Sequence, residues 1–177
     1  MIFQPTDIEG AFLIKIEPHH DERGFFARTF CTDEFEEQGL APSVAQCNVS
    51  FNHKRGTLRG MHSQKKPHEE TKVVRCTRGA IHDVIVDLRS DSPSFLKHYA
   101  VDLTCDDRLA LYVPRGVFHG FQTLMDSTEV FYQMSRPFVP GVGSGYRWSD
   151  PAFSIRWPIE VSVISRRDAS YPDYEPI

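Results

Sequence analysis

The chain lacks several features that would place it in specialised protein classes. Its cysteines (Cys31, Cys47, Cys76 and Cys105) are widely spaced and form no C-x-x-C pair, which argues against a disulfide framework or a zinc knuckle. No apolar run approaches the length that spans a bilayer, and the N-terminus lacks the basic start and apolar stretch of a signal peptide. We therefore expect a cytoplasmic protein with reduced thiols and no membrane partner.

Positive charge is also in short supply. The 177 residues carry 20 Lys and Arg against 24 Asp and Glu, so the net charge of −4 does not favour nucleic acid as a partner. A local basic pocket for a phosphorylated small molecule remains compatible with this balance. With 40% hydrophobic and 25% charged residues, the composition suits one globular domain over residues 1–177.

What the chain does have is a series of short segments with apolar residues at every second position. This period is typical of β-strands, and polar turns separate the segments. We expect strands at residues 11–17, 25–30, 46–52, 56–64, 71–77, 80–89, 97–104, 108–114, 120–125 and 128–135. The pattern predicts an all-β fold, a mostly antiparallel cupin-like jelly roll or β-barrel.

One short helix and a loop-rich C-terminal tail complete the expected fold. The segment TDEFEEQG (32–39) is the best helix candidate, because Thr32 can cap its start, acidic residues fill its first turn and Gly39 can end it. The tail, residues 136–177, is rich in proline and holds both tryptophans. We expect it to lie across the barrel.

The stretch LRGMHSQKKPHEETK (58–72) is crowded with polar side chains and admits three interpretations. The first is a metal site, because a later segment, PRGVFHGF, supplies His119 at a spacing similar to the second motif of metal-binding cupins. Such a site needs two histidines at i and i+2, which would share one strand face. Here the pair is His62 and Gln64, and an amide is a weak ligand for a transition metal.

The second interpretation is a polar strand edge without chemistry. Most lone polar side chains are solvated or satisfied by local hydrogen bonds. Glu69 and Glu70 follow Pro67 and fit a solvated turn of this kind.

Strand alternation supports the third interpretation, an acid–base site inside the barrel. His62, Lys72, Asp83 and Tyr132 each share a strand face with apolar neighbours and are expected to point inward. Burying so many polar groups is costly unless they satisfy one another, and Asp83 is expected to support the others. A base, a cation for an enolate oxygen and an opposing phenol suit proton transfer next to a carbonyl.

Arg59 does not fit this alternation. In a regular strand Arg59 and His62 face opposite ways. Either Gly60 marks a bulge or twist, or Arg59 acts from elsewhere, such as a dimer interface.

A series of longer motifs resembles one known family. The motifs are DERGFF (21–26), GTLRGMHSQ (56–64), KVVRCTRGAIHDVIVDLR (72–89), YVPRGVFHGFQTL (112–124), EVFYQMS (129–135) and GYRWSDPAFSIRWP (145–158). Taken in order, from about Phe12 to Asp168, they resemble the dTDP-4-dehydrorhamnose 3,5-epimerase family. The resemblance implies a homodimeric jelly roll that epimerises nucleotide-diphosphate-linked 4-keto-6-deoxyhexoses with no metal and no other cofactor.

The resemblance also implies roles for individual residues. His62 matches the general base that removes the proton alpha to the C4 ketone, and Asp168 matches the carboxylate that orients this histidine and raises its basicity. Tyr132 matches the acid on the opposite face, and Lys72 matches the cation beside the enolate oxygen. The residues expected to bind substrate are Arg23, Phe26, Gln46, Asn48, Arg59, His119 and Phe138.

Three departures from the family pattern leave the substrate open. Arg28 stands where an acidic residue is usual, Val49 interrupts a common Asn-His-Ser, and residues 136–145 lack the usual acids. The expected reaction converts dTDP-4-dehydro-6-deoxyglucose to dTDP-4-dehydrorhamnose, with a C3-only or C5-only epimerase of a CDP- or GDP-linked sugar as the alternative. A metal-dependent cupin enzyme and a sugar-binding jelly roll without catalysis are the candidates from other classes.

Overall fold

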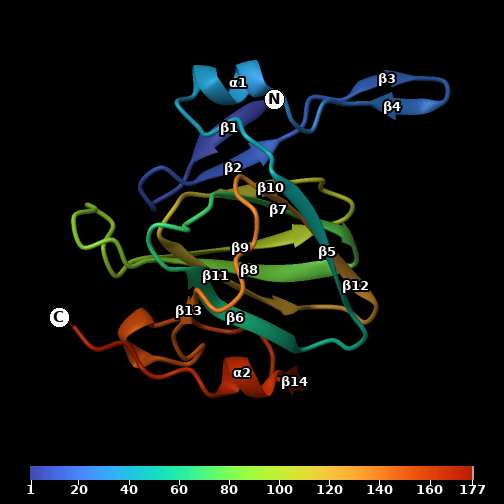
Figure 1. Ribbon diagram of the computed structural model, residues 1–177. Helices are drawn as coiled ribbons and strands as arrows, with labels where there is room; N and C mark the ends of the chain where they lie inside the picture. Colours follow the sequence, from blue (N-terminus) through green and yellow to red (C-terminus); the bar gives the residue numbers. More distant parts are fainter. Residues whose placement is uncertain (177) are drawn as a thin grey trace.

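The computed structural model describes residues 1–176, and two facing β-sheets form its body (Figure 1). In spatial order, the first sheet contains β1 (Ile2–Pro5), β2 (Phe12–Lys15), β10 (Ala110–Val113), β7 (Lys72–Arg78), β12 (Thr128–Met134) and β5 (Gln46–Asn52). The second contains β13 (Gly143–Gly145), β6 (Thr57–Gln64), β11 (Val117–Thr123), β8 (Ala80–Asp87) and β9 (His98–Thr104), with β14 (Val163–Ile164) beside β6. This arrangement confirms the predicted all-β, cupin-like jelly roll.

Pairing between neighbouring strands is antiparallel except for β14, which runs parallel to β6. Alternate side chains of both sheets point into the space between them, as the period of two requires. The buried core there consists mainly of aliphatic residues: Val74, Ile81, Ile85, Leu103, Leu111, Val113, Val117 and Val130, together with Phe121.

The helix α1 (Thr32–Glu37) covers the outer face of the first sheet, with Phe35 packed among Ile14, Val73 and Tyr112. Its predicted cap is wrong, because Cys31 occupies the N-cap position and makes no side-chain capping bond. The predicted end is confirmed. Gly39 has a φ of 70°, and the backbone N–H groups of Gly39 and Leu40 donate to Glu36 and Phe35 in a Schellman arrangement.

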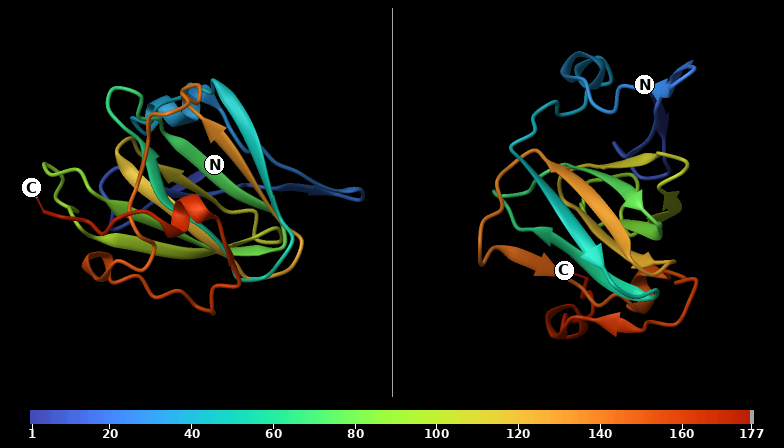
Figure 2. Two further views of the ribbon diagram at one scale, coloured as in Figure 1. Left: turned by 60° about the horizontal axis from the view of Figure 1, so that its bottom comes forward. Right: turned by 90° about the vertical axis from the view of Figure 1, so that its right-hand side faces the viewer.

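The C-terminal tail packs on the outer face of the second sheet, as expected. It contains the 3-10 helix η1 (Pro151–Phe153), the strand β14 and the helix α2 (Arg166–Ala169). Phe153 is buried against Met61, Val84 and Val86. The two sheets are therefore covered on opposite outer sides, by N-terminal segments and by the tail (Figure 2).

Two predicted strands have different limits in the structure. The expected strand at 25–30 is shorter, because β4 (Gly24–Phe26) ends at Phe26. It pairs with β3 (His19–Asp21) in a separate hairpin that projects from the body in the views of Figures 1 and 2. The expected strand at 120–125 begins earlier, at Val117. Within residues 1–176, no helix is long and apolar enough to cross a membrane.

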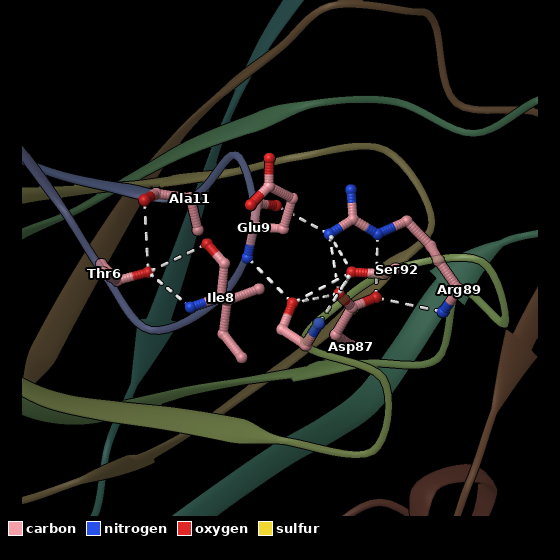
Figure 3. A network of polar contacts seen from close by, with 8 residues as sticks. Thr6, Ile8, Glu9, Ala11, Asp87, Arg89 and Ser92 are labelled. Carbon is pink, nitrogen blue, oxygen red and sulfur yellow. Dashed lines mark hydrogen bonds and ion pairs between the residues drawn. The ribbon is translucent and has the colours of Figure 1, made fainter.

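A buried carboxylate ties the loop after β8 to the loop between β1 and β2 (Figure 3). Asp87 accepts hydrogen bonds from Arg89 Nε at 2.8 Å and Nη2 at 2.7 Å, and from the hydroxyls of Ser92 and Ser94. Arg89 and Ser94 also bond to the backbone of Glu9. Burial by itself would raise the pKa of the Asp87 carboxyl, but these hydrogen bonds outweigh it and lower the pKa to about 2.

We expect Asp87→Asn to fold but to lose about 2–4 kcal/mol of unfolding free energy, because it removes the buried charge that accepts from Arg89, Ser92 and Ser94 and leaves the part-buried guanidinium without its ion-pair partner. Urea denaturation at pH 7 measures the loss, with Asp91→Asn in the same exposed loop as the matched control. The lowered pKa also sets how this stabilisation depends on pH. The contribution of Asp87 to the unfolding free energy is present above pH 4 and is lost as the pH falls through about 2. A variant as stable as the parent at pH 7 would contradict this role.

Candidate functional site

A cavity of about 280 Å³ lies between the two sheets and collects most of the predicted site residues. The first sheet supplies residues of β5, β7 and β12, and the second supplies residues of β6, β11 and β13. The predicted residues that line the cavity are Asn48, Arg59, His62, Lys72, His119, Tyr132 and Phe138. The sandwich thus brings polar groups such as Asn48 and Tyr132, which are 84 residues apart in sequence, into one pocket.

A bulge in β6 allows both Arg59 and His62 to face this cavity. His119 of β11 pairs with His62, but Phe121 pairs with Arg59, so β6 carries one residue more than β11 over this interval. Gly60 has a φ of 119°, and a Cβ there would lie 2.5 Å from the Cα of Gly120. The bulge expected at Gly60 is therefore confirmed, and Arg59 Nε donates to Asn52 Oδ1 at 2.8 Å.

His62 and Tyr132 face the cavity from opposite sheets and have opposite proton preferences. Burial lowers the pKa of His62 to about 3, and Lys72, His119 and Arg167 add unfavourable positive charge. Burial also raises the pKa of the Tyr132 phenol well above its usual range, with a further contribution from the negative charge of Asp83. The imidazole is thus neutral and free to accept a proton, whereas the phenol keeps its own proton.

The expectation that Asp168 orients His62 and raises its basicity stays a prediction, because no carboxylate of the described part of the chain is among the groups that shift the pKa of His62. Asp168 is buried in α2, and Ser165 caps that helix by accepting from the Asp168 backbone N–H at 3.0 Å. Among residues 1–176 no hydrogen bond joins the Asp168 carboxylate to the His62 ring, and burial dominates the pKa of His62 instead.

The second imidazole of the cavity has a carboxylate partner. His119 Nε2 lies 2.7 Å from Oδ1 of Asp83, and both side chains are buried. With a carboxylate as acceptor, Nε2 carries the proton and the ring orientation is fixed. The His119 ring also meets the Tyr132 ring edge-on, with centroids 6.2 Å apart. Asp83 therefore has the inward, supporting position that alternation predicted.

Lys72 is held by a residue that was expected to be solvated. Its Nζ lies 3.3 Å from Oε1 of Glu70, and their side chains are 8% and 2% exposed. Glu70 Oε2 accepts a hydrogen bond from Gln64 Nε2 at 2.7 Å. The interpretation of Glu70 as part of a solvated turn is therefore wrong, because the loop between β6 and β7 folds back over the cavity wall.

Two amide side chains anchor the segment that carries Phe138. Oε1 of Gln46 accepts from the Phe138 backbone N–H at 2.7 Å, and Oε1 of Gln64 accepts from the Val139 N–H at 2.9 Å. Gln46 itself does not line the cavity, although it was expected to bind substrate. The structure instead gives Gln46 a supporting position behind Phe138, whose ring is exposed at the cavity.

Arg23 and Phe26 lie away from the cavity, on the projecting β3–β4 hairpin (Figure 1). The Arg23 side chain is 84% exposed and pairs only with Asp21 of the same hairpin among the described residues, while Phe26 is 79% exposed. These two predicted binding residues are therefore not brought to the cavity of their own chain.

Arg167 lines the cavity, yet it was not among the predicted site residues. A Cβ at residue 143 would collide with the Nη2 atom of Arg167, so Gly143 makes room for the guanidinium. Its Nε donates to the Tyr171 hydroxyl at 2.8 Å. The sequence did offer a clue to Arg167, because this arginine directly precedes Asp168, which was predicted to belong to the site.

Within residues 1–176, no group of three or more His, Cys, Asp or Glu side chains comes together in a way that could hold a metal ion. Gln64, which stands where a metal-binding cupin needs its second histidine, has both amide atoms engaged with Glu70, His68 and Val139.

Comparison with known proteins gives a consistent result. The dTDP-4-dehydrorhamnose 3,5-epimerase family matches residues 5–175. An enzyme of that name from Sinorhizobium fredii is 37% identical over 97% of this chain and 89% of its own, and a dTDP-4-dehydrorhamnose 3-epimerase from Streptomyces niveus is 36% identical over 95% and 81%. The crystal structure of the Bacillus anthracis 3,5-epimerase, with TDP and PPi bound, superimposes with a TM-score of 0.93 at 36% identity, covering 98% of this chain and 99% of that one.

The lowered pKa of His62 predicts a specific pH effect on stability. Between pH 6.5 and about pH 3 the unfolded chain binds a proton at this histidine and the folded chain does not, so unfolding free energy is lost as the pH falls. His62→Asn removes the histidine whose protonation in the unfolded chain causes this loss. We expect the melting temperature of the variant to fall less between pH 7 and pH 5 than that of the parent, with His53→Asn, at an exposed ring, as the control. Equal falls for parent and His62→Asn would contradict the assignment.

Proposed function

The chain belongs to the dTDP-4-dehydrorhamnose 3,5-epimerase family, which consists of carbohydrate epimerases, and we propose that it inverts a nucleotide-linked 4-keto-6-deoxyhexose by proton transfer through an enolate. The favoured substrate is dTDP-4-dehydro-6-deoxyglucose and the product dTDP-4-dehydrorhamnose. The observation that carries the proposal is the placement of a neutral His62 and a protonated Tyr132 on opposite walls of one cavity.

In the proposed step, His62 takes the proton from the carbon alpha to the C4 ketone. The electrons of the broken C–H bond form a planar enolate, and the ketone oxygen takes up the negative charge. Tyr132 then gives its phenolic proton to the same carbon from the opposite face, which inverts the centre. Solvent returns a proton to the tyrosine and removes one from the histidine, so one such cycle serves each inverted carbon.

Cationic side chains around the cavity suit the charges of this substrate. A proton alpha to a ketone is too weakly acidic for a neutral imidazole unless the enolate oxygen is stabilised, and Lys72 is the buried cation available for that oxygen. Arg59 and Arg167 provide guanidinium groups for the diphosphate, which arginine binds well. The negative charge of the diphosphate also favours protonated His62 and so strengthens this base when substrate is bound.

A role for Asp168 as the partner of His62 stays a prediction. Asp168 belongs to α2 next to Arg167, whose charge acts on His62.

The positions of Arg23 and Phe26 support a homodimer in which the β3–β4 hairpin of one protomer reaches the cavity of its partner. A cationic and an aromatic side chain on an exposed hairpin, away from their own cavity, have the chemistry to bind a diphosphate and a base. Asn48 and Phe138 line the cavity and are available to the same nucleotide.

Inversion at a single carbon remains the second candidate, because the identity to the Streptomyces niveus 3-epimerase, 36%, is close to that of the 3,5-epimerases. Isotope exchange at separate carbons distinguishes the two. In deuterium oxide, each carbon that the enzyme deprotonates gains deuterium, and NMR of the sugar shows whether C3, C5 or both exchange.

We expect purified protein to exchange deuterium into dTDP-4-dehydro-6-deoxyglucose, and His62→Asn to lower the exchange rate by about 100-fold or more, since a general base contributes about 10²–10⁴. Tyr132→Phe should keep part of the exchange, because His62 still removes and returns the proton, but should form little inverted product. NMR follows both quantities in one sample.

His53→Asn serves as the matched control and should exchange at the parent rate, because its ring is exposed and outside the cavity. If parent protein exchanged no proton of any dTDP-, CDP- or GDP-linked 4-keto-6-deoxyhexose, the proposed function would have to be given up.

The shared site makes a separate prediction. Arg23→Ala should weaken dTDP binding by about tenfold, the effect of losing one charged hydrogen-bonding partner worth about 1.5 kcal/mol. Mixing and re-equilibrating Arg23→Ala with His62→Asn protomers should restore activity at limiting substrate, because half of the sites in a mixed dimer then carry neither change. We also expect light scattering to give the parent protein a molar mass of twice the chain mass of 20.3 kDa. A monomeric parent, or a mixture no more active than its components, would exclude the shared site.

A further inference from the structure

Glu70 is a buried carboxylate beside a cavity whose positively charged lining groups are Arg59, Lys72 and Arg167. A carboxylate loses much of its hydration when it is buried, and a buried ion pair does not by itself make a protein more stable than an apolar pair would. A negative charge in this wall also works against binding of an anionic nucleotide. Glu70 therefore needs an explanation other than stability or substrate affinity.

The contacts of Glu70 point to Lys72. Its Oε1 lies 3.3 Å from Lys72 Nζ, and within residues 1–176 it is the one carboxylate within ion-pair distance of that ammonium. Its other oxygen is held by Gln64 Nε2 at 2.7 Å. Gln64 is itself fixed, because it accepts from the Val139 N–H and donates to the His68 carbonyl. A rigid chain of bonds thus runs from the backbone through Gln64 and Glu70 to Lys72.

We propose that Glu70 is a positioning residue for Lys72, which keeps the ammonium group beside the reacting ketone. A lysine side chain has a flexible stem and a compact charge, so without a fixed partner its ammonium follows the strongest negative charge in reach. In this cavity that charge is the diphosphate of the substrate. The inference rests on the proposed function, in which Lys72 stabilises the enolate oxygen.

This role predicts opposite effects on turnover and on binding. Removing the charge of Glu70 frees Lys72 to pair with the diphosphate, which strengthens nucleotide binding and withdraws the ammonium from the enolate. The other charged or titratable groups at this cavity are His62, Arg59, Arg167, His119 and Asp83, and none of them is changed in the variant. Simple loosening of the wall would weaken binding and turnover together.

The test is Glu70→Gln, which keeps the shape of the side chain and a bond to Gln64. We expect kcat to fall by about tenfold, less than the ~100-fold loss typical of deleting an oxyanion donor, while KM does not rise and the Kd for dTDP falls. In a Lys72→Met background the same change should alter the slow deuterium exchange by less than about twofold, because residues that act through one another are not additive. Glu70→Asp, which keeps the charge on a shorter stem, should lie between the parent and Glu70→Gln.

Glu69→Gln is the matched control, since it removes the neighbouring charge without touching the cavity, and it should keep parent kcat. Parent kcat in Glu70→Gln, an additive loss on top of Lys72→Met, or an unchanged or higher Kd for dTDP would each overturn the inference. If the parent showed no exchange at all, the proposed function would fall, and the dTDP titration of Glu70→Gln would still test the charge effect, with unchanged or weaker binding overturning it.

Discussion

The site depends on the close approach of two backbones where Gly60 of β6 meets Gly120 of β11. A Cβ on Gly60 would lie 2.5 Å from the Cα of Gly120, and a Cβ on Gly120 would lie 2.5 Å from the sulfur of Met61. Neither strand tolerates a side chain here, and the extra residue of β6 is accommodated at this point. Because of that bulge, Arg59 and His62 turn toward the same cavity, so the guanidinium proposed to bind the diphosphate and the imidazole proposed to accept the proton come from one strand.

The rest of the sandwich then supplies an environment that separates acid from base. Both sheets bury their inner faces, and burial disfavours whichever form of a group is charged. For an imidazole that form is protonated, and for a phenol it is deprotonated, so the same loss of hydration leaves His62 neutral and Tyr132 protonated. The nearby charges add to this difference, because positive groups surround His62 and the negative charge of Asp83 acts on Tyr132.

The sequence predicts the strands and the inward-facing site residues wherever apolar and polar residues alternate regularly along a strand. The period of two placed Lys72, Asp83 and Tyr132 on inward faces, and it identified the strands of both sheets other than β1, β13 and β14. It failed for Glu70, because Lys65, Lys66 and Pro67 indicate an exposed turn and nothing local shows that the chain returns to the barrel. The spacing of Glu70 and Lys72, two residues apart and so on one face of an extended chain, was the available clue. For Arg23 and Phe26 the motif indicated binding residues, but it could not show that the β3–β4 hairpin projects away from the cavity of the same chain.

The two amides that hold the Phe138 segment connect these observations. Gln46 comes from the first sheet and Gln64 from the second, and each accepts a backbone N–H of neighbouring residues 138 and 139. The segment is therefore tied to both walls of the cavity, and these bonds limit where the Phe138 ring can lie. Gln64 also reaches Lys72 through Glu70. A second histidine at position 64 would supply neither the carbonyl oxygen for Val139 nor the paired donors for His68 and Glu70, so an amide here joins the Phe138 segment to the ammonium of Lys72.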